Sequence, residues 1–323
     1  MSGIGSLINT RINLLAIGHP SLIADYRKPL KERGSEPNIY MFHKIDKLSF
    51  INEECIVEKE KLVLKIKNHT QNYCLTFDLT KVFEIAYLNG NYFSGKYELL
   101  SSGKRIKIFY TNDNWFTMDA TDFMTNYEYF KFVQEKEAYS IRGPIVLETI
   151  YVGMAYGSEG SRNAFDRISK HSKLQEILSE AYDEHWNEDI VVSLWEVQSS
   201  IITGMIGNSD NIDKDIKHIE KIFNGPLDYK QLVNLTEAGI IYHLQPTYNT
   251  VLKKIFPNNK SKSYSEIYFR EFDGISIEFG LEDHNVTIVS NDIMITEQTS
   301  FIEVKWLDLN DKEFFKKMVY GEL

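Results

Sequence analysis

Hydrophobic and polar residues alternate with the period of a β-strand through much of the chain between residues 37 and 134. The clearest alternating runs are KLVLKIKN at 61–68, YCLTFDLT at 73–80 and KRIKIFY at 104–110. Turn dipeptides such as Asn89-Gly90 and Ser102-Gly103 punctuate this region. Such dipeptides are typical of tight hairpins, so the pattern predicts a small antiparallel sheet, and no catalytic constellation is visible in it.

From about residue 138 the pattern changes to alternating strands and helices. Two β-prone arms flank Arg142-Gly143-Pro144, where Gly and Pro favour a chain reversal, so we expect a hairpin. Apolar residues then recur at helical spacing from Asn163 to about Trp186, which predicts one or two helices. The remaining elements of this segment are a nearly continuous apolar strand at 189–197 and helices at about 211–223 and 227–244.

After residue 256 the chain again contains β-prone runs, and a short amphipathic helix is expected near 311–320. The patterns together predict an α+β chain whose middle holds a small mixed sheet with flanking helices, preceded and followed by β-rich segments. We therefore expect a β-rich N-terminal domain at 1–134, a middle domain at 135–256 and a β-rich C-terminal extension with a terminal helix at 257–323.

The charge of the chain is acidic. Its 323 residues include 36 Lys+Arg and 46 Asp+Glu, for a formal net charge of −10. A dominant function that coats nucleic acid through bulk charge is therefore excluded. Residues 1–134 are the exception, because cations slightly outnumber carboxylates there. If a phosphate backbone is the partner, its basic contact surface is sparse or comes from this first segment.

The two cysteines, Cys55 and Cys74, are too few for a disulfide scaffold or a zinc cage, so a reducing compartment is expected, with both cysteines buried. The first residues lack a basic region followed by an uninterrupted apolar stretch, and no run of about 18 apolar residues occurs. We therefore expect a soluble cytoplasmic protein with no membrane partner.

Four sequence features of the middle segment occur in the order along the chain that a known family shows. They are Tyr151-Val152-Gly153, the pair Arg167 and His171, Glu237, and Tyr248-Asn249. In this order they resemble the GIY-YIG nuclease superfamily over about residues 136–256. The resemblance implies a small sheet with helices beside it and metal-dependent cleavage of phosphodiester bonds, with DNA favoured over RNA. It also implies that Glu237 binds the metal, that Arg167 and His171 form the Arg-x-x-x-His helix segment, and that Asn249 is the closing Asn.

The superfamily takes its name from two short motifs, and this chain departs from the first of them, Gly-Ile-Tyr. Its best counterpart near Tyr151 is Ala138-Tyr139-Ser140, so we assign Tyr139 the position of the first tyrosine. The connection from Tyr151 to Arg167 is longer than usual in the family and contains a Gly-rich stretch at 156–161. Arg162 competes for the phosphate-binding role, but only Arg167 has a His one helical turn later.

The chemistry of these residues suits phosphodiester hydrolysis. Arg167 and His171 at i and i+4 bring a guanidinium for phosphate and an imidazole for proton transfer to one helix face. A single carboxylate, Glu237, is compatible with Mg²⁺ or Mn²⁺, because these ions keep water and phosphate as other ligands. The phenols of Tyr139 and Tyr151 would orient or deprotonate water, which requires a neighbour that lowers their pKa from about 10.

Each of these residues also has an ordinary structural interpretation as a strand tyrosine, a surface arginine or a helix cap. Three hypotheses therefore stay open. The first is an endonuclease. The second is a nuclease-like domain without turnover that binds nucleic acid or protein as a regulatory module. The third is a structural protein with coincidental motifs. A protein partner or a homo-oligomer through the β-rich segments is compatible with each of them.

Overall fold

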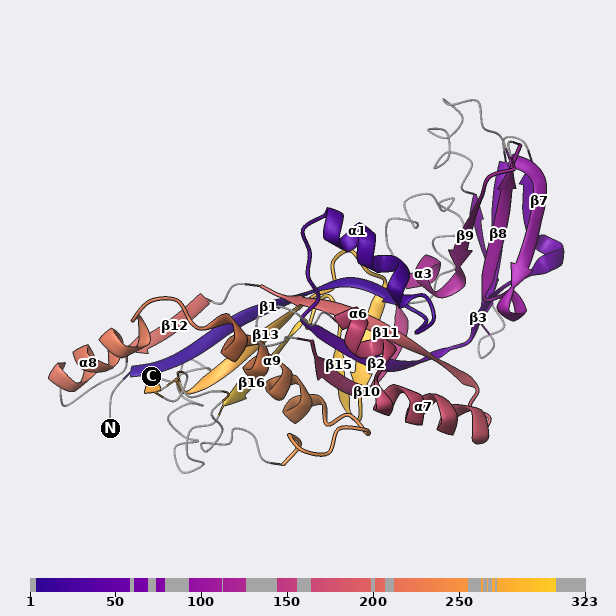
Figure 1. Cartoon of the computed structure of the whole chain (residues 1–323). Helices are drawn as coiled ribbons and strands as arrows, with labels where there is room; N and C mark the ends of the chain where they lie inside the picture. The colour runs from indigo at the N-terminus through magenta and orange to yellow at the C-terminus, as the bar shows by residue number, and fades with distance from the viewer. Residues whose placement is uncertain are drawn as a thin grey trace.

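The computed structural model describes residues 4–58, 61–68, 74–78, 93–111, 113–125, 144–155, 164–198, 201–206, 212–254 and 272–305, together with residues 263, 266, 269 and 270. A nine-stranded sheet forms its centre (Figure 1). The strand order is β15-β14-β10-β2-β11-β1-β13-β16, with β12 paired to β1. The strands are β1 (Ile4–Gly18), β2 (Ile39–Asp46), β10 (Ile145–Met154), β11 (Glu188–Val197), β12 (Ile201–Ile206), β13 (Gly274–Gly280), β14 (Val286–Ser290), β15 (Ile293–Ile295) and β16 (Phe301–Lys305).

This sheet crosses both of the domain boundaries expected from the sequence. Strands β1 and β2 come from residues 1–134, β10 to β12 from 135–256, and β13 to β16 from 257–323. The α+β class is confirmed, but the expectation of a small middle sheet is corrected to one large sheet shared by all three segments. Alternation along a strand reports which face is buried and carries no information about the strand that pairs with it, so the sequence pattern missed this sharing.

The strand that pairs antiparallel with β10 is β2, far upstream in the chain. The register places Phe42 opposite Tyr151 and Tyr40 opposite Gly153. On the other edge of β10, its first residues pair in parallel with β14. The expected hairpin around Arg142-Gly143-Pro144 has its first arm outside the described residues, and β2 holds the antiparallel position beside Tyr151.

Two smaller antiparallel sheets lie between β2 and β10 in the sequence. Their strands are β3 (Leu48–Phe50), β4 (Ile56–Glu58), β5 (Lys61–Asn68) and β6 (Cys74–Asp78), and then β7 (Phe93–Leu100), β8 (Arg105–Tyr110) and β9 (Trp115–Asp119). This confirms the antiparallel pairing expected for the runs at 61–68 and 104–110. The turn at Ser102-Gly103 is observed. Gly103 has φ +86, and a Cβ added to it would lie 3.1 Å from the carbonyl oxygen of Phe50. The turn dipeptide Asn89-Gly90 lies outside the described residues.

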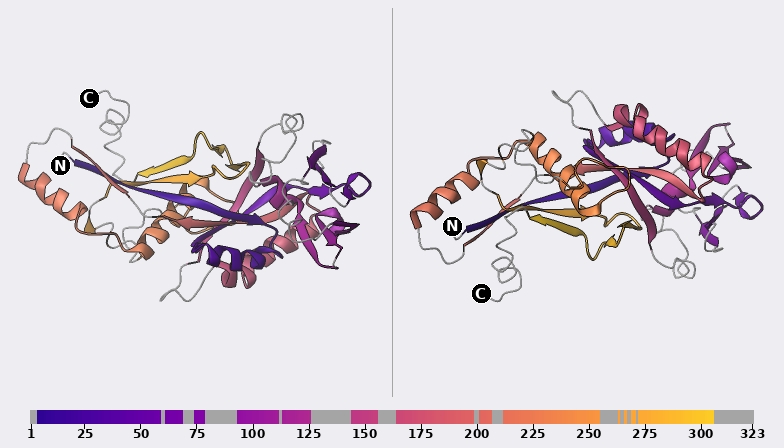
Figure 2. Two further views of the ribbon diagram at one scale, coloured as in Figure 1. Left: turned by 90° about the horizontal axis from the view of Figure 1, so that it is seen from above. Right: turned by 90° about the horizontal axis from the view of Figure 1, so that it is seen from below.

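The two ends of the molecule differ in their elements. Seen from above and below, β1 runs along much of the length, with β12 and α8 near one end and β3 to β9 near the other (Figure 2). The helices are α1 (Arg27–Glu32), preceded by a 3-10 turn at Ile23–Tyr26, and then α3 (Ala120–Thr125), α6 (Ala164–Ser169), α7 (Ser172–Asp183), α8 (Ile212–Ile222) and α9 (Tyr229–Leu244). In the part of the chain that the structure describes, no helix is long and apolar enough to cross a membrane.

The helices follow the sequence prediction closely. The stretch predicted to hold one or two helices forms two, α6 and α7, separated at Lys170 and His171. The prediction that Arg167 and His171 share one helix face is therefore wrong: α6 ends at Ser169, and His171 has an extended backbone (φ −80, ψ 108) as the N-cap of α7. The strand expected at 189–197 is β11, and it is central, between β1 and β2. Helix α9 begins after Asp228, whose side chain accepts a hydrogen bond from the Gln231 amide at 2.9 Å. The helix expected near 311–320 lies outside the described residues.

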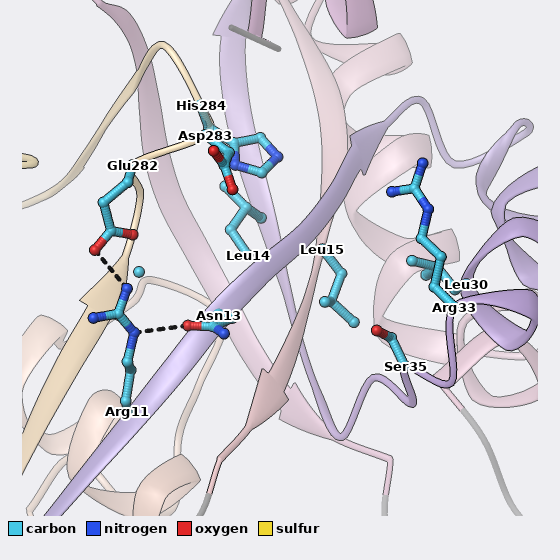
Figure 3. Close-up of a pocket in the computed structure, with 11 residues that line it drawn as sticks. Arg11, Asn13, Leu14, Leu15, Leu30, Arg33, Ser35, Glu282, Asp283 and His284 are labelled. Carbon is cyan, nitrogen blue, oxygen red and sulfur yellow. Dashed lines mark hydrogen bonds and ion pairs between the residues drawn. The ribbon is translucent and has the colours of Figure 1, made fainter. Parts of the chain in front are cut away.

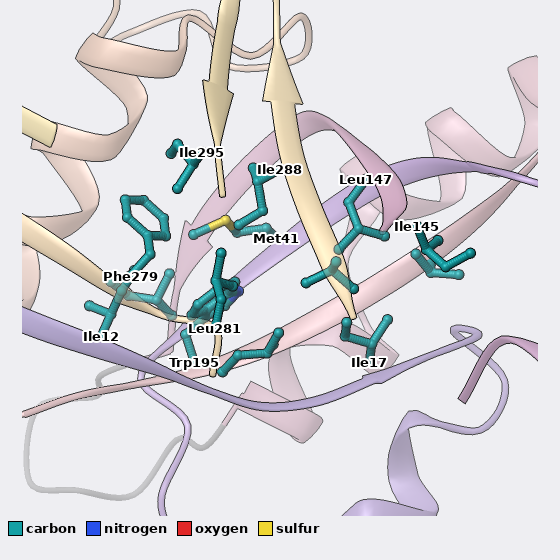
Figure 4. Close-up of a cluster of buried hydrophobic side chains, with 14 of the residues drawn as sticks. Ile12, Ile17, Met41, Ile145, Leu147, Trp195, Phe279, Leu281, Ile288 and Ile295 are labelled. Carbon is teal, nitrogen blue, oxygen red and sulfur yellow. The ribbon is translucent and has the colours of Figure 1, made fainter. Parts of the chain in front are cut away.

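Alternate residues of the central strands enter two different cores. Ile39 and Met41 of β2 join a core that includes Trp195 and Phe279 (Figure 4). Tyr40 and Phe42 point to the opposite face. That second core packs under α6 and α7 through Phe165, Ile168, Leu174 and Ile177. Because both faces of the sheet are covered, the candidate residues on β10 are held on a rigid support. Cys55 is buried, as expected.

Candidate functional site

The structure describes five of the six residues singled out by the sequence. Tyr151 lies on β10, Arg167 on α6, His171 at the start of α7, Glu237 on α9 and Asn249 in the segment after α9. Tyr139 lies outside the described residues, so its assignment stays a prediction.

The His171 ring lies against three aromatic rings. Its centroid is 5.1 Å from that of Tyr151, 5.4 Å from Phe42 and 5.5 Å from Tyr40, each in an edge-on arrangement. Tyr151 in turn stacks on Phe42 with centroids 5.1 Å apart. Such pairs are favourable because the positive edge of one ring meets the negative face of another. The imidazole is therefore held in one orientation relative to the tyrosines.

His171 also begins helix α7. Its Nδ1 accepts a hydrogen bond from the backbone amide of Leu174 at 3.3 Å, which satisfies one of the unpaired amides of the first turn. In the neutral ring this geometry assigns the proton to Nε2. Burial, and then the charges of Arg167 and Lys173, lower the pKa of His171 below its usual value, so the neutral form is favoured.

Tyr40 is a site residue that the sequence analysis missed. It is buried, and its ring lies over Gly153, where an added Cβ would approach the Tyr40 Cζ and Oη to 2.6 Å. The phenols of Tyr40 and Tyr151 are hydrogen-bonded to each other, and burial is the main cause that raises the pKa of both. The sequence signal was Ile39-Tyr40, which has the Ile-Tyr of the expected first half-motif. The local pattern does not reveal that β2 pairs with β10, and only this pairing brings Tyr40 beside Tyr151.

Glu237 enters the same region from α9. It is half-buried in an otherwise apolar helix, and burial raises the pKa of its carboxyl to about 7. A hydrogen bond from the Met154 amide and the charge of Arg167 oppose this rise. Glu237 in turn raises the pKa of Tyr40 and Tyr151, so the carboxylate and the two phenols share one environment.

Arg167 contacts the other side of Met154. Its Nη1 donates to the Met154 carbonyl oxygen at 2.6 Å, while the Met154 amide donates to Glu237. The backbone of one residue at the end of β10 therefore connects the guanidinium and the carboxylate. Such a connection fixes both groups relative to the strand.

Arg167 and His171 face a cavity of about 570 Å³. The other residues that line it are Asp166, Lys170 and Ser172. Tyr40, Tyr151 and Glu237 are not among the lining residues. The structure thus brings five side chains together, of which two line this cavity and three do not.

Asn249 has a different environment from the one expected. Its Oδ1 accepts from the Val152 amide and its Nδ2 donates to the Val152 carbonyl oxygen, both at 2.8 Å. The preceding residue, Tyr248, donates its amide to the Ile150 carbonyl oxygen at 2.8 Å. The observed role of Asn249 is to extend the hydrogen bonding of β10 beyond β14. Contact with a substrate stays a prediction.

The donor set offers little to a metal ion. Among the described residues, no group of three or more His, Cys, Asp or Glu side chains could hold a metal ion. Glu237 is a single carboxylate, and only an ion that keeps most of its ligands as water or phosphate, such as Mg²⁺, fits such a site. Its raised pKa means that binding would compete with a proton near neutral pH.

A second cavity, of about 520 Å³, lies beside β1 (Figure 3). Arg11 on one wall donates to Asn13 at 2.9 Å and to Glu278 at 2.7 Å, and it also pairs with Glu282. Its charge is therefore matched by two carboxylates of the protein itself. Nothing in the sequence pattern had pointed to this cavity.

The comparisons with known proteins add no relative: no protein-family model, curated protein or solved structure matches the chain.

Proposed function

We propose that this chain is a metal-dependent phosphodiesterase of the GIY-YIG type, acting as an endonuclease on DNA. The observation that carries the proposal is the convergence of five side chains from five separate elements, β2, β10, α6, α7 and α9, at the Met154 end of β10. They are Tyr40, Tyr151, Arg167, His171 and Glu237. Chance motif matches would leave these residues scattered over the fold.

The strand pairing supports the same proposal. In it, Tyr40 takes the position that the sequence analysis gave to Tyr139, because Ile39-Tyr40 lies on the strand that pairs with Tyr151-Val152-Gly153. Three neighbouring strands of the large sheet, in the antiparallel order β10-β2-β11, carry α6 and α7 on one face. The peripheral sheets β3 to β9 are then an insertion between the two half-motifs.

The site residues have distinct roles in this proposal. Arg167 binds non-bridging oxygens of the scissile phosphate with its remaining N–H groups, since only one is shown donating to Met154. Neutral His171 presents Nε2 for proton exchange, because Nδ1 is used in the helix cap. Tyr40 and Tyr151 position the imidazole through ring contacts.

Glu237 would hold Mg²⁺ or Mn²⁺, which supplies positive charge for the phosphate and a more acidic water. The carboxyl must lose its proton first, and its pKa of about 7 makes that step sensitive to pH near neutrality. Arg167 and the Met154 amide favour the ionised form.

The direct test is cleavage of labelled duplex, branched and single-stranded DNA by the purified full chain with Mg²⁺ or Mn²⁺. We expect metal-dependent cleavage that the isosteric change Glu237→Gln reduces to the level of a reaction without metal. The matched control is Glu220→Gln, at an exposed position on α8. Equal cleavage by wild type and Glu237→Gln, or no cleavage by the wild type with either metal, would reject the proposal.

The second candidate is a nuclease-like module that binds nucleic acid without turnover. The observation that favours it is that Tyr40, Tyr151 and Glu237 do not line the cavity that Arg167 and His171 face. In that case the wild type would retain DNA in a binding assay while leaving it intact in every divalent metal.

A further inference from the structure

The surface next to the cavity of Arg167 carries an unusual density of positive charge for this acidic protein. Residues 27–33, which comprise α1 and Arg33, hold four cations and one carboxylate. Residues 164–173, which comprise α6 and the start of α7, hold three cations and one carboxylate. The two segments are in contact, because Arg27 of α1 forms an ion pair with Asp166 of α6.

Local sequence explains why α1 presents its cations outward. Leu30 is buried and anchors the helix, and Pro29 is tolerated because it lies in the first turn. Gly34, with φ +74, provides the left-handed residue that commonly follows a helix end. The long polar side chains of α1 are then left on the solvent side, where Lys28 is 86% exposed.

The cations of this surface divide into those engaged in ion pairs and those facing solvent. Arg27 is engaged, since it pairs with Asp166 and its guanidinium carbon lies 5.3 Å from the ring centroid of Phe165. Lys173 is also engaged, with Glu176 at 2.6 Å. Lys28 forms a long ion pair with Glu32, at 3.9 Å. Because both side chains are exposed, this pair is weak and screened by salt. Lys31 and Lys170 are exposed, whereas Arg33 lines the separate cavity beside β1.

We infer that Lys28, Lys31 and Lys170, defined here as the α1 basic patch, bind the phosphate backbone of a DNA strand that continues from the cavity of Arg167. Lys170 lines that cavity, and the Arg27–Asp166 pair docks α1 beside it. A row of lysines contacting phosphates supplies affinity by releasing counterions, independent of base sequence. The inference rests on the proposed function for its substrate, and binding tests it separately from cleavage.

The occupant is a nucleic acid strand because exposed lysines on two segments in contact lie beside a cavity of about 570 Å³ that Arg167 and Lys170 line. The Arg27–Asp166 pair holds α1 beside that cavity, so the basic surface is preformed. An acidic chain that repels polyanions elsewhere would bind a strand in one place and one orientation.

The test measures binding of a fluorescein-labelled duplex DNA by fluorescence anisotropy, with the full chain in EDTA so that no cleavage occurs. The variant is Lys28→Gln with Lys31→Gln. The control is Lys217→Gln with Lys230→Gln, which removes the same charge from exposed positions on α8 and α9. We expect the α1 variant to lose roughly tenfold in affinity at about 0.1 M salt for each phosphate contact removed, and its salt slope to fall by about one per contact. The control should bind like the wild type.

Several outcomes would overturn the inference. They are equal binding by the α1 variant and the control, no binding of DNA by the wild type, and binding to phosphatidylserine vesicles in place of DNA. Wild-type cleavage with an unaffected α1 variant would reject this inference and leave the proposed function standing. Binding that depends on α1 without cleavage in any metal would do the opposite. All variants are surface changes, and their thermal melting should match that of the wild type.

Discussion

The ring of Tyr40 lies directly on the backbone of Gly153, so closely that a Cβ at Gly153 would come within 2.6 Å of the phenol. The two residues are register partners on β2 and β10. The glycine of the Tyr151-Val152-Gly153 triplet is therefore required by packing, whatever chemistry the site performs. This contact also places Tyr40 against His171 and Tyr151.

The first prediction concerns this contact. Gly153→Ala should lower the free energy of unfolding by about 1–3 kcal/mol, because the methyl group overpacks a rigid core. Urea denaturation measures the change. Combining it with Tyr40→Leu should recover part of the loss, since the shorter side chain leaves room for the methyl group. Additive losses in the double variant would contradict the packing explanation.

The second prediction separates the two roles of His171. Asn is a good helix N-cap and accepts a hydrogen bond as the imidazole does, so His171→Asn should lose the ring contacts but keep the cap, and it should be about 0.5–2 kcal/mol more stable than His171→Ala. It should still reduce cleavage by about a hundredfold or more, because Asn cannot exchange the proton. The comparison variant is His171→Ala, which should lose both. Full activity in His171→Asn would show that the residue serves only the helix.

The third prediction concerns the pH dependence of the Glu237 site. Burial raises the pKa of this carboxyl to about 7, so below that pH it is protonated and a metal must displace the proton. At subsaturating Mg²⁺, the cleavage rate should therefore rise about tenfold per pH unit below pH 7 and level off above it. A rate that is constant from pH 5 to 8 would contradict the assignment of Glu237 as the metal ligand.

The fourth prediction concerns a buried polar group in the sheet. His43 is fully buried, with Nδ1 3.1 Å from the Thr149 hydroxyl and Nε2 2.7 Å from the Ser193 hydroxyl, and burial lowers its pKa to about 3. The unfolded chain takes up the proton first, at a pKa of about 6.5, so stability falls as the pH drops below that value and continues to fall to about pH 3. At pH 5 the loss should be about 2 kcal/mol.

Other groups also shift, so a variant is needed to isolate His43. Burial lowers the pKa of His284 to about 4, which acts in the same direction, and raises that of Asp122 to about 6, which acts in the opposite one. His43→Gln keeps a donor and an acceptor but does not titrate. The difference between wild type and variant in urea denaturation should therefore change with pH in the way described. A difference independent of pH from 5 to 8 would show that His43 does not carry the effect.

Local sequence patterns predicted the helices and strands well but not the pairing of the strands. Helices α6 to α9 and strand β11 were found because each has its own apolar period or breaking residues, such as the Asn224-Gly225-Pro226 break after α8. The pairing of β2 with β10 was not predicted, because strands β3 to β9 lie between these two strands in the sequence. Tyr40 was missed for that reason alone.

The sequence by itself determined the α+β class, most of the secondary structure in the middle of the chain, and the order of Tyr151, Arg167, His171 and Glu237. These follow from local backbone preferences and from the spacing of side chains within one element. Only the tertiary structure decided that strands from all three segments share one sheet, that Tyr40 joins the site, and that Asn249 bonds to Val152. The physical reason is that packing across the whole fold selects strand partners and buried polar contacts. The alternation of residues along one strand does not identify the strand that pairs with it.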